Sequence, residues 1–283
     1  ARTVDSPGAA ARLVVDTSGV TTFGGAVGAN AALDSVTTDA PGSVALDGGL
    51  VRTTGAQTYD DAVILGGPTS LVTIADGGLT AGGAFDGVAG TLTLDLGAGA
   101  AVLTNAANDF GVVEVASASA VTLVDANALV LGGAQLSGML HVTAGGAVTQ
   151  SAPVAAATLS VRTLSDAGAA ITLTDAGNDV DAVNLQARNA GGDSNVVAGV
   201  GYVDADDVTV QGLQTSGAAT VSSSGTIRVD ADVAAGSLTI RSTAADIVLA
   251  AGRTLTTDGA GTTLVLDAAR RFVNDGATLV PGT

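Results

Sequence analysis

The sequence predicts an all-β protein folded as a parallel β-helix, or β-solenoid, of roughly eleven to fourteen coils. Three observations lead to this fold class. A strand-and-corner unit recurs, short segments alternate apolar and polar residues with the period of a strand, and glycine-rich corners separate these segments. No stretch of ten residues holds a helical period free of glycine, so helices are not expected.

The clearest repeat is a thirteen-residue unit at residues 103–115 (LTNAANDFGVVEV) and again at residues 173–185 (LTDAGNDVDAVNL). Each copy reads as the end of one strand, a polar corner built on Asn-Asp, and the start of the next strand. Asn and Asp suit a corner because their short side chains bond to the local backbone. Asn108 and Asn178 are therefore predicted to form corners whose amides stack between coils.

The first expected strands follow a polar lead-in at residues 1–11. Segments 12–16, 20–23, 33–38 and 44–46 are rich in aliphatic and β-branched residues, which favour a pleated, half-buried surface. The corners between them carry the Gly, Pro and Asp that a sharply bending backbone requires.

The rest of the chain shows the most regular alternation, which places one face of each strand in a core and the other in water. Expected strands here are residues 71–74, 91–96, 112–115, 140–143, 159–162, 183–186, 208–211, 238–241 and 264–267. Their starts recur about every two dozen residues, the length of one coil with two or three strands. Residues 12–283 are thus expected to form a single solenoid domain, with a β-sandwich pair or a propeller as the rival architecture.

The composition fits a narrow core filled by aliphatic side chains. The chain is 47% hydrophobic but has only 4 Phe, 2 Tyr and no Trp. Its 40 glycines show no three-residue period, so they are interpreted as corners and not as a collagen-like repeat. Plentiful and regularly alternated apolar residues also argue against disorder.

The chain is strongly acidic, with 27 acidic and 10 basic residues and a net charge of −17. Such a surface repels nucleic acid and anionic lipid, so no nucleic-acid partner is expected. No apolar run approaches the ~18 residues of a membrane helix, so membrane insertion is not expected either. The lack of Cys excludes disulfides and thiolate metal sites. The opening residues, which lack Met, are interpreted as belonging to a piece of a longer chain or to a processed product.

Five phrases carry a family resemblance: residues 21–27 (TTFGGAV), 107–112 (ANDFGV), 147–153 (AVTQSAP), 246–255 (DIVLAAGRTL) and 271–282 (RFVNDGATLVPG). They resemble the repeats of filamentous haemagglutinin-like exoproteins, the large bacterial surface proteins exported by two-partner secretion. The resemblance implies a right-handed parallel β-helix, export to the bacterial cell surface or extracellular matrix, and a role as adhesin shaft or matrix fibre. The family's secretion domain, with its Asn-Pro-Asn signatures, is not recognised in this sequence.

No catalytic residue is predicted. His141, the only His, lies on the polar side of an expected strand without a Cys or Ser partner in its motif, which is typical of a surface residue. Parallel β-helices also serve as polysaccharide lyases and hydrolases, so a carbohydrate-active enzyme is the alternative function, with Asp60-Asp61 and the acids of residues 204–207 as candidates. Adjacent strand residues point to opposite faces, which disfavours a shared groove for either cluster.

Oxygen donors at corners are the remaining candidate ligands. Asp193, Asp204, Asp206 and Asp207 are weak candidates for a Ca²⁺ site. Their segments match neither the glycine-rich nonapeptide repeat nor a helix-loop-helix calcium motif. No cofactor is therefore expected, and a Ca²⁺-dependent assembly module is kept as a further alternative.

The sequence thus favours a structural segment of a secreted bacterial surface fibre or adhesin. Stacked coils add length without new folding problems, and open strand edges at the ends favour end-to-end docking. The expected partners are other copies of the chain in a fibre and a glycan or protein on a host or other surface.

Overall fold

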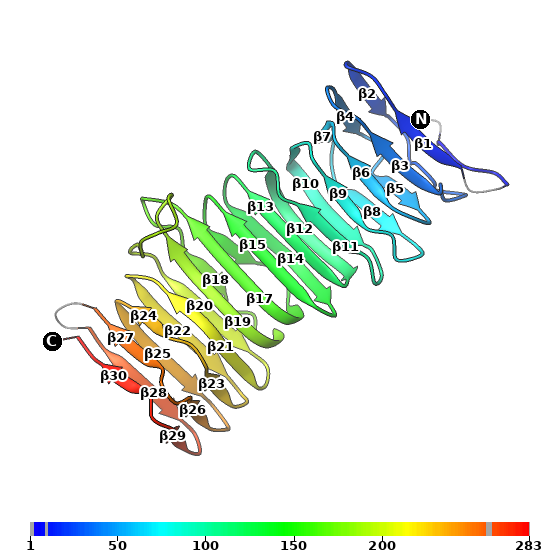
Figure 1. Cartoon of the computed structure of the whole chain (residues 1–283). Coiled ribbons are helices and arrows are strands. Elements are labelled where there is room, and N and C mark those ends of the chain that lie inside the picture. The colour runs from blue at the N-terminus through cyan, green and yellow to red at the C-terminus, as the bar shows by residue number, and fades with distance from the viewer. Residues whose placement is uncertain (1–2, 9–10, 259–261, 283) are drawn as a thin grey trace. The chain divides into compact units, whose positions relative to one another are not determined.

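The computed structural model describes residues 3–8, 11–258 and 262–282, and it confirms the predicted fold class (Figure 1). These residues contain strands β1 to β30 and no helix, and hence no helix able to cross a membrane. Parallel strands of successive turns stack as a β-solenoid, with about 13 turns in all. The chain divides into two compact units, Ala1–Val142 and Thr143–Thr283.

In the N-terminal unit, strands of successive turns pair in parallel and form three columns. The first column consists of β1 (Arg12–Val15), β3 (Ser35–Thr38), β6 (Gln57–Tyr59), β9 (Leu79–Ala81), β11 (Ala100–Leu103) and β13 (Ala120–Asp125). The second consists of β2 (Val20–Phe23), β4 (Ser43–Leu46), β7 (Ala62–Leu65) and the first parts of β10 (Phe85–Asp95) and β12 (Asp109–Ala118). The third consists of β5 (Leu50–Thr53), β8 (Thr69–Thr73), the later parts of β10 and β12, and β14 (Leu129–Leu136). The unit ends in β15 (Met139–Ala144).

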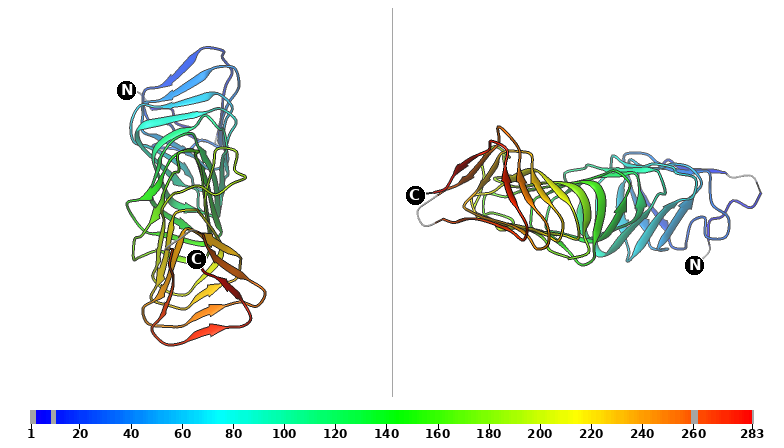
Figure 2. Two further views of the ribbon diagram at one scale, coloured as in Figure 1. Left: turned by 90° about the vertical axis from the view of Figure 1, so that its left-hand side faces the viewer. Right: turned by 90° about the horizontal axis from the view of Figure 1, so that it is seen from below.

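The C-terminal unit repeats this plan, and Figure 2 shows its later turns, yellow to red, lying one behind another. One column consists of β16 (Val148–Gln150), β18 (Ile171–Leu173), β20 (Val200–Asp204), β22 (Ala218–Ser223), β25 (Ser237–Ser242) and β28 (Leu264–Ala268). The other two columns share the long strands β17 (Val154–Leu164), β19 (Asp179–Arg188) and β21 (Val208–Gln214). They continue separately as β23 (Ile227–Val229), β26 (Ile247–Leu249) and β29 (Phe272–Asn274), and as β24 (Val233–Ala235), β27 (Thr254–Thr257) and β30 (Thr278–Val280).

Several strands are longer than the segments that the sequence predicts. β10 and β17 each run for 11 residues, because the chain bends from one column into the next without leaving the extended conformation. In β17 the pairing with β19 passes directly from Ala156 to Thr158 at this bend. Small residues here allow the bend, whereas a corner such as Asp275-Gly276 between β29 and β30 divides the same path into two strands.

The register corrects part of the predicted coil spacing. Leu159 pairs with Val183 and Leu238 with Leu264, which are the equivalences expected from the sequence. Val183, however, pairs with Val210 and not with Val208. The expected starts also combined two columns, because Val208 pairs with Ile227 of β23, whereas Leu238 on β25 belongs to the column of β22 and β28.

The core follows the predicted alternation and is mainly aliphatic. In β13 and β22, for example, every second residue is buried. An aromatic cluster interrupts this pattern in the N-terminal unit: the ring centroids of Tyr59 and Phe85 lie 5.8 Å apart, and those of Phe85 and Phe110 lie 5.9 Å apart. Turns stack so closely at some corners that only glycine fits; a Cβ on Gly83 would lie 1.8 Å from the carbonyl oxygen of Asp61.

The first residues of the described chain take part in the fold. Val4, within the expected lead-in, forms a parallel bridge with Val27, which in turn bridges Val51 of β5. The boundary at residue 11 and the single domain at residues 12–283 remain predictions.

Candidate functional site

The first copy of the thirteen-residue unit folds into a corner around the buried side chain of Asn108. Its Nδ2 donates to the carbonyl oxygen of Leu103 in its own turn and to that of Val124 in the next turn, both at 3.0 Å. Its Oδ1 accepts the backbone N–H of Phe85 in the preceding turn at 2.9 Å. One amide therefore joins three successive turns. It supplies hydrogen-bond partners to one backbone N–H and two backbone carbonyl groups at the corner.

The second copy forms the same corner around Asn178. Its Nδ2 donates to Leu173 at 3.3 Å and to Val203 at 2.9 Å, and its Oδ1 accepts the backbone N–H of Val154 at 2.9 Å. The amide also exchanges two hydrogen bonds with the amide of Gln150, at 2.8 and 3.1 Å. The predicted stacking of amides is thus found here as one side-chain pair, while the other bonds go to the backbone of adjacent turns.

A buried aspartate follows each asparagine corner, one turn later. In the N-terminal unit this residue is Asp125, which accepts the backbone N–H groups of Phe110 at 2.6 Å and Asn127 at 2.8 Å. Burial raises the pKa of Asp125, and these two hydrogen bonds oppose the rise. The carboxylate serves the same purpose as the asparagine, because it accepts the buried backbone N–H of Phe110 at the corner.

Asp204 is the corresponding residue in the C-terminal unit. It accepts the backbone N–H groups of Val180 at 3.3 Å and Asp206 at 3.1 Å, and the buried hydroxyl of Tyr202 donates to it. Burial raises the pKa of Asp204 to about 6, although all three bonds favour the charged form. Burial and the neighbouring carboxylate raise the pKa of Tyr202 as well. The side chain of Asp204 is buried and points into the interior, away from solvent.

The other predicted calcium ligands are placed on two separate loops, before and after β20. Asp206 and Asp207 are exposed at the corner between β20 and β21, whereas Asp193 lies on the loop between β19 and β20. Over residues 3–8, 11–258 and 262–282, no three His, Cys, Asp or Glu side chains come close enough together to hold a metal ion.

The Asp193 loop is held by hydrogen bonds within the protein. Asp193 accepts from Asn189 at 2.8 Å and from Ser194 at 3.2 Å, and these bonds hold its pKa below the usual range, with help from the charge of Arg188. The guanidinium of Arg162 donates to the carbonyl oxygen of Gly192 beside it. Two arginines close to the loop make its potential less favourable for a cation.

The remaining acid doublet and the histidine lie as the strand period predicts. Asp60 is exposed while Asp61 is buried, so the two carboxylates face opposite sides of the backbone. His141 is half-buried on β15, between the buried residues Leu140 and Val142. Asp60 and Asp61, candidate acids of the alternative carbohydrate-active function, therefore do not face one groove as a pair.

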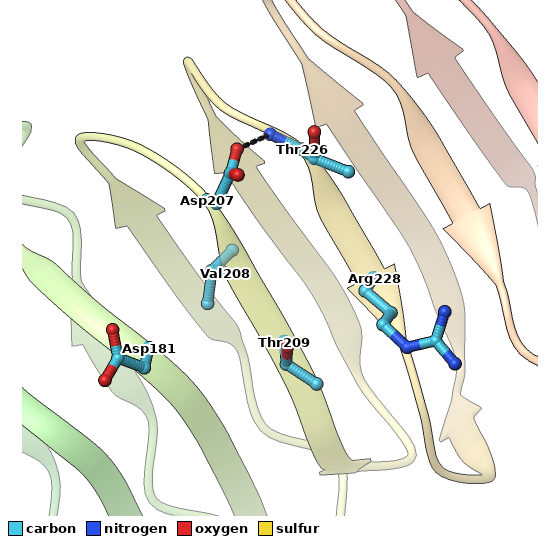
Figure 3. A pocket seen from close by; sticks show the side chains of 6 residues that line it. All are labelled: Asp181, Asp207, Val208, Thr209, Thr226 and Arg228. Carbon is cyan, nitrogen blue, oxygen red and sulfur yellow. Dashed lines mark hydrogen bonds between the residues drawn. The ribbon is translucent and has the colours of Figure 1, made fainter.

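A shallow groove of about 360 Å³ lies over β19, β21 and β23 of the C-terminal unit (Figure 3). Figure 3 shows Asp181 and Arg228 on either side of Thr209, and Asp207 accepting the backbone N–H of Thr226 at 2.5 Å. The described residues that line this groove include no aromatic ring on which a sugar could stack. Its chemistry is that of an open polar surface able to form hydrogen bonds with a carbohydrate or a peptide.

Sequence reasoning missed the buried polar pairs of the interior. Besides Tyr202 and Asp204, the hydroxyl of Tyr59 donates to Gln57 at 3.0 Å, and Gln57 donates to the carbonyl oxygen of Val72 at 3.0 Å. Both pairs are two residues apart on a strand and therefore share one face. In each pair the polar residue lies two positions from a buried residue of the same strand, and this period of two could have predicted its burial.

Comparison with known protein families gives a match to part of the chain. A family model described as repeats of unknown function (DUF5649) matches residues 118–186, which include the whole second copy of the thirteen-residue unit. No curated protein gives a significant match to the chain, and no solved structure does so either. The match supports the repeat character of this part of the sequence.

Proposed function

We propose that this chain is a structural segment of a secreted bacterial surface fibre or adhesin of the filamentous haemagglutinin-like kind. It acts as an elongated β-helical shaft that associates end to end. The observation that carries the proposal is the parallel pairing of each turn with the next in each unit. Buried asparagines add hydrogen bonds between turns at the corners. Such a fold transmits force along the stack and grows by repetition.

The terminal turns support association between copies. At the C-terminal turn, Phe272 is 45% exposed and Val280 is 43% exposed, on β29 and β30. At the N-terminal turn, Val20 of β2 is 71% exposed, and Val14 of β1 is also exposed. Strands β1 and β30 each pair in parallel with one neighbouring turn, β3 and β27. A head-to-tail contact between such ends does not close on itself and therefore builds a filament.

The proposed partners and location follow from the same reasoning. The net charge of −17 makes nucleic acid and anionic lipid poor partners, and the open groove over β19 to β23 suits a glycan or a protein at a cell surface. The resemblance of the repeats to exported exoproteins supports a location at the bacterial cell surface or in the extracellular matrix. The proposal assigns the chain no catalytic activity and no cofactor.

Sedimentation velocity over a range of protein concentrations tests the proposal. An elongated shaft gives a frictional ratio above that of a globular protein of equal mass, and end-to-end association raises the sedimentation coefficient as concentration increases. A compact monomer at every concentration would contradict it.

A further inference from the structure

The corners of the first turns contain a buried acid whose side chain has no partner. Asp61, between β6 and β7, is 1% exposed, and neither of its carboxylate oxygens has a hydrogen bond. Only its backbone N–H is bonded, to the hydroxyl of Thr38 at 3.3 Å. Asp39, at the same corner of the preceding turn, also has a buried oxygen without a partner.

The atoms around the Asp61 carboxylate are acceptors. A Cβ placed on Gly42 would lie 2.7 Å from Asp61 Oδ1, 2.4 Å from the carbonyl oxygen of Thr17 and 3.1 Å from that of Gly19. These three oxygen atoms, two from the loop that follows β1 and one from the corner that follows β6, therefore lie close together beside Gly42, at the corner of the turn between them. The Gly19 oxygen already accepts the backbone N–H of Ser43 at 3.1 Å, so the Thr17 oxygen and the two carboxylates are the oxygens left to bind something else.

This environment is costly for a bare carboxylate. A buried charge needs an opposite charge or donated hydrogen bonds, and Asp61 has neither. Burial, together with the negative charges of Asp39 and Asp60, raises the pKa of Asp61. The asparagine corners of later turns show the contrast, because there every inward-facing side-chain oxygen accepts a backbone N–H.

We propose that Asp39 and Asp61, together with the carbonyl oxygen of Thr17, bind a divalent cation of the Ca²⁺ class. The three residues lie at the corners that follow β1, β3 and β6, so the ion joins three successive turns of the N-terminal unit. Two carboxylates balance its charge. Carboxylate and carbonyl oxygens in irregular geometry suit Ca²⁺ better than Mg²⁺, which requires a near-ideal octahedron. The site shares no residue with the Ca²⁺ ligands predicted from the sequence, and it does not depend on the proposed shaft function.

Isothermal titration of the chelator-treated full chain with CaCl₂ tests the site, with Asp61→Asn as the variant. The control is Asp60→Asn, which removes the same charge from the adjacent, exposed position. We expect saturable binding by the wild type and by Asp60→Asn, and at least a tenfold loss of affinity in Asp61→Asn. No saturable binding by the wild type, or equal binding by Asp61→Asn, would overturn the proposal.

Thermal unfolding provides a second measurement that does not depend on binding heat. Millimolar CaCl₂ should raise the Tm of the wild type by about 3 °C or more and leave that of Asp61→Asn unchanged. If Asp61 carries a proton and binds no ion, the Tm of the wild type will not respond to Ca²⁺, and the proposal is wrong. Should Asp61→Asn fail to fold by circular dichroism, Asp39→Asn is tested in the same way, with the same loss expected.

Discussion

A single buried amide determines how three turns are joined at the asparagine corners. Replacing Asn108 by Ala removes three hydrogen bonds and leaves the backbone groups of Phe85, Leu103 and Val124 without partners in the interior. We expect the free energy of unfolding to fall by about 2 to 4 kcal/mol, measured by urea denaturation. Asn127→Ala at an exposed position should change it by less than about 0.5 kcal/mol. Equal stability of the two variants would refute the role of the corner.

Asp204 predicts a specific dependence of stability on pH. Its pKa in the folded protein is about 6, above the ordinary value of 3.8, so folding favours the protonated form. The stability from this group is fully present below about pH 4 and is lost as the pH rises through 6. The free energy of unfolding of the wild type relative to Asp204→Asn should therefore fall by about 1 to 3 kcal/mol between pH 4 and pH 7.5.

Tyr202→Phe is the companion variant for this experiment. The phenol hydroxyl donates to the Asp204 carboxylate and favours its charged form, so its removal should move the transition to higher pH. Chemical denaturation at a series of pH values measures both effects. Parallel pH profiles for the wild type and Asp204→Asn would show that Asp204 does not titrate in this range.

At the level of single residues, the corner asparagines could be predicted from the sequence. The buried polar side chains of the interior could not. Asn108 and Asn178 were recognisable because the same phrase surrounds both. Asp204 looked like a solvated calcium ligand because it begins an acidic run, yet it shares its face with Val200 and Tyr202 on β20. The burial of Asp61 could not be predicted for a similar reason. Its carboxylate lies beside Gly42 of the preceding turn, and no local pattern encodes this contact.

At the scale of strands, backbone pairing on both sides is the main constraint. β22 pairs with β20 on one side and with β25 on the other, and the side chain of Thr220 in its centre is exposed. Thr220→Pro should lower the free energy of unfolding by about 3 kcal/mol or more, because proline cannot donate to the ladder. Thr220→Ala changes only the side chain and should cost less than about 1 kcal/mol in the same urea titration. A similar loss for both substitutions would mean that the ladder is not the source of stability.

The existence of the strands was predictable from alternation, whereas their length and column were not. Every expected strand from residue 71 onward overlaps a strand of the structure, and two of them, 71–74 and 91–96, extend one residue beyond it. The continuation of β10 and β17 around a bend depends on pairing with the neighbouring turns, which no local pattern encodes. The mistaken equivalence of Val183 and Val208 is a shift of two residues within the pairing of β19 and β21, which leaves the same face of the strand inward and so is not fixed by alternation.

At the scale of the whole molecule, the exposed terminal turns should control association. Phe272→Asp places a charge on the last turn and should weaken concentration-dependent association at least tenfold in sedimentation velocity. Val197→Asp is the control, since Val197 is more exposed than Phe272 but lies on the loop before β20. Association that is weakened equally by both variants would point to non-specific contacts between side faces.

Electron microscopy of the negatively stained protein, over a range of concentrations, tests the central claim most directly. About 13 turns at a strand spacing of ~4.8 Å predict filaments one solenoid wide with an axial repeat on the order of 60 Å. Phe272→Asp should shorten these filaments. Isolated particles at all concentrations, or wide bundles without this repeat, would contradict a shaft that grows end to end.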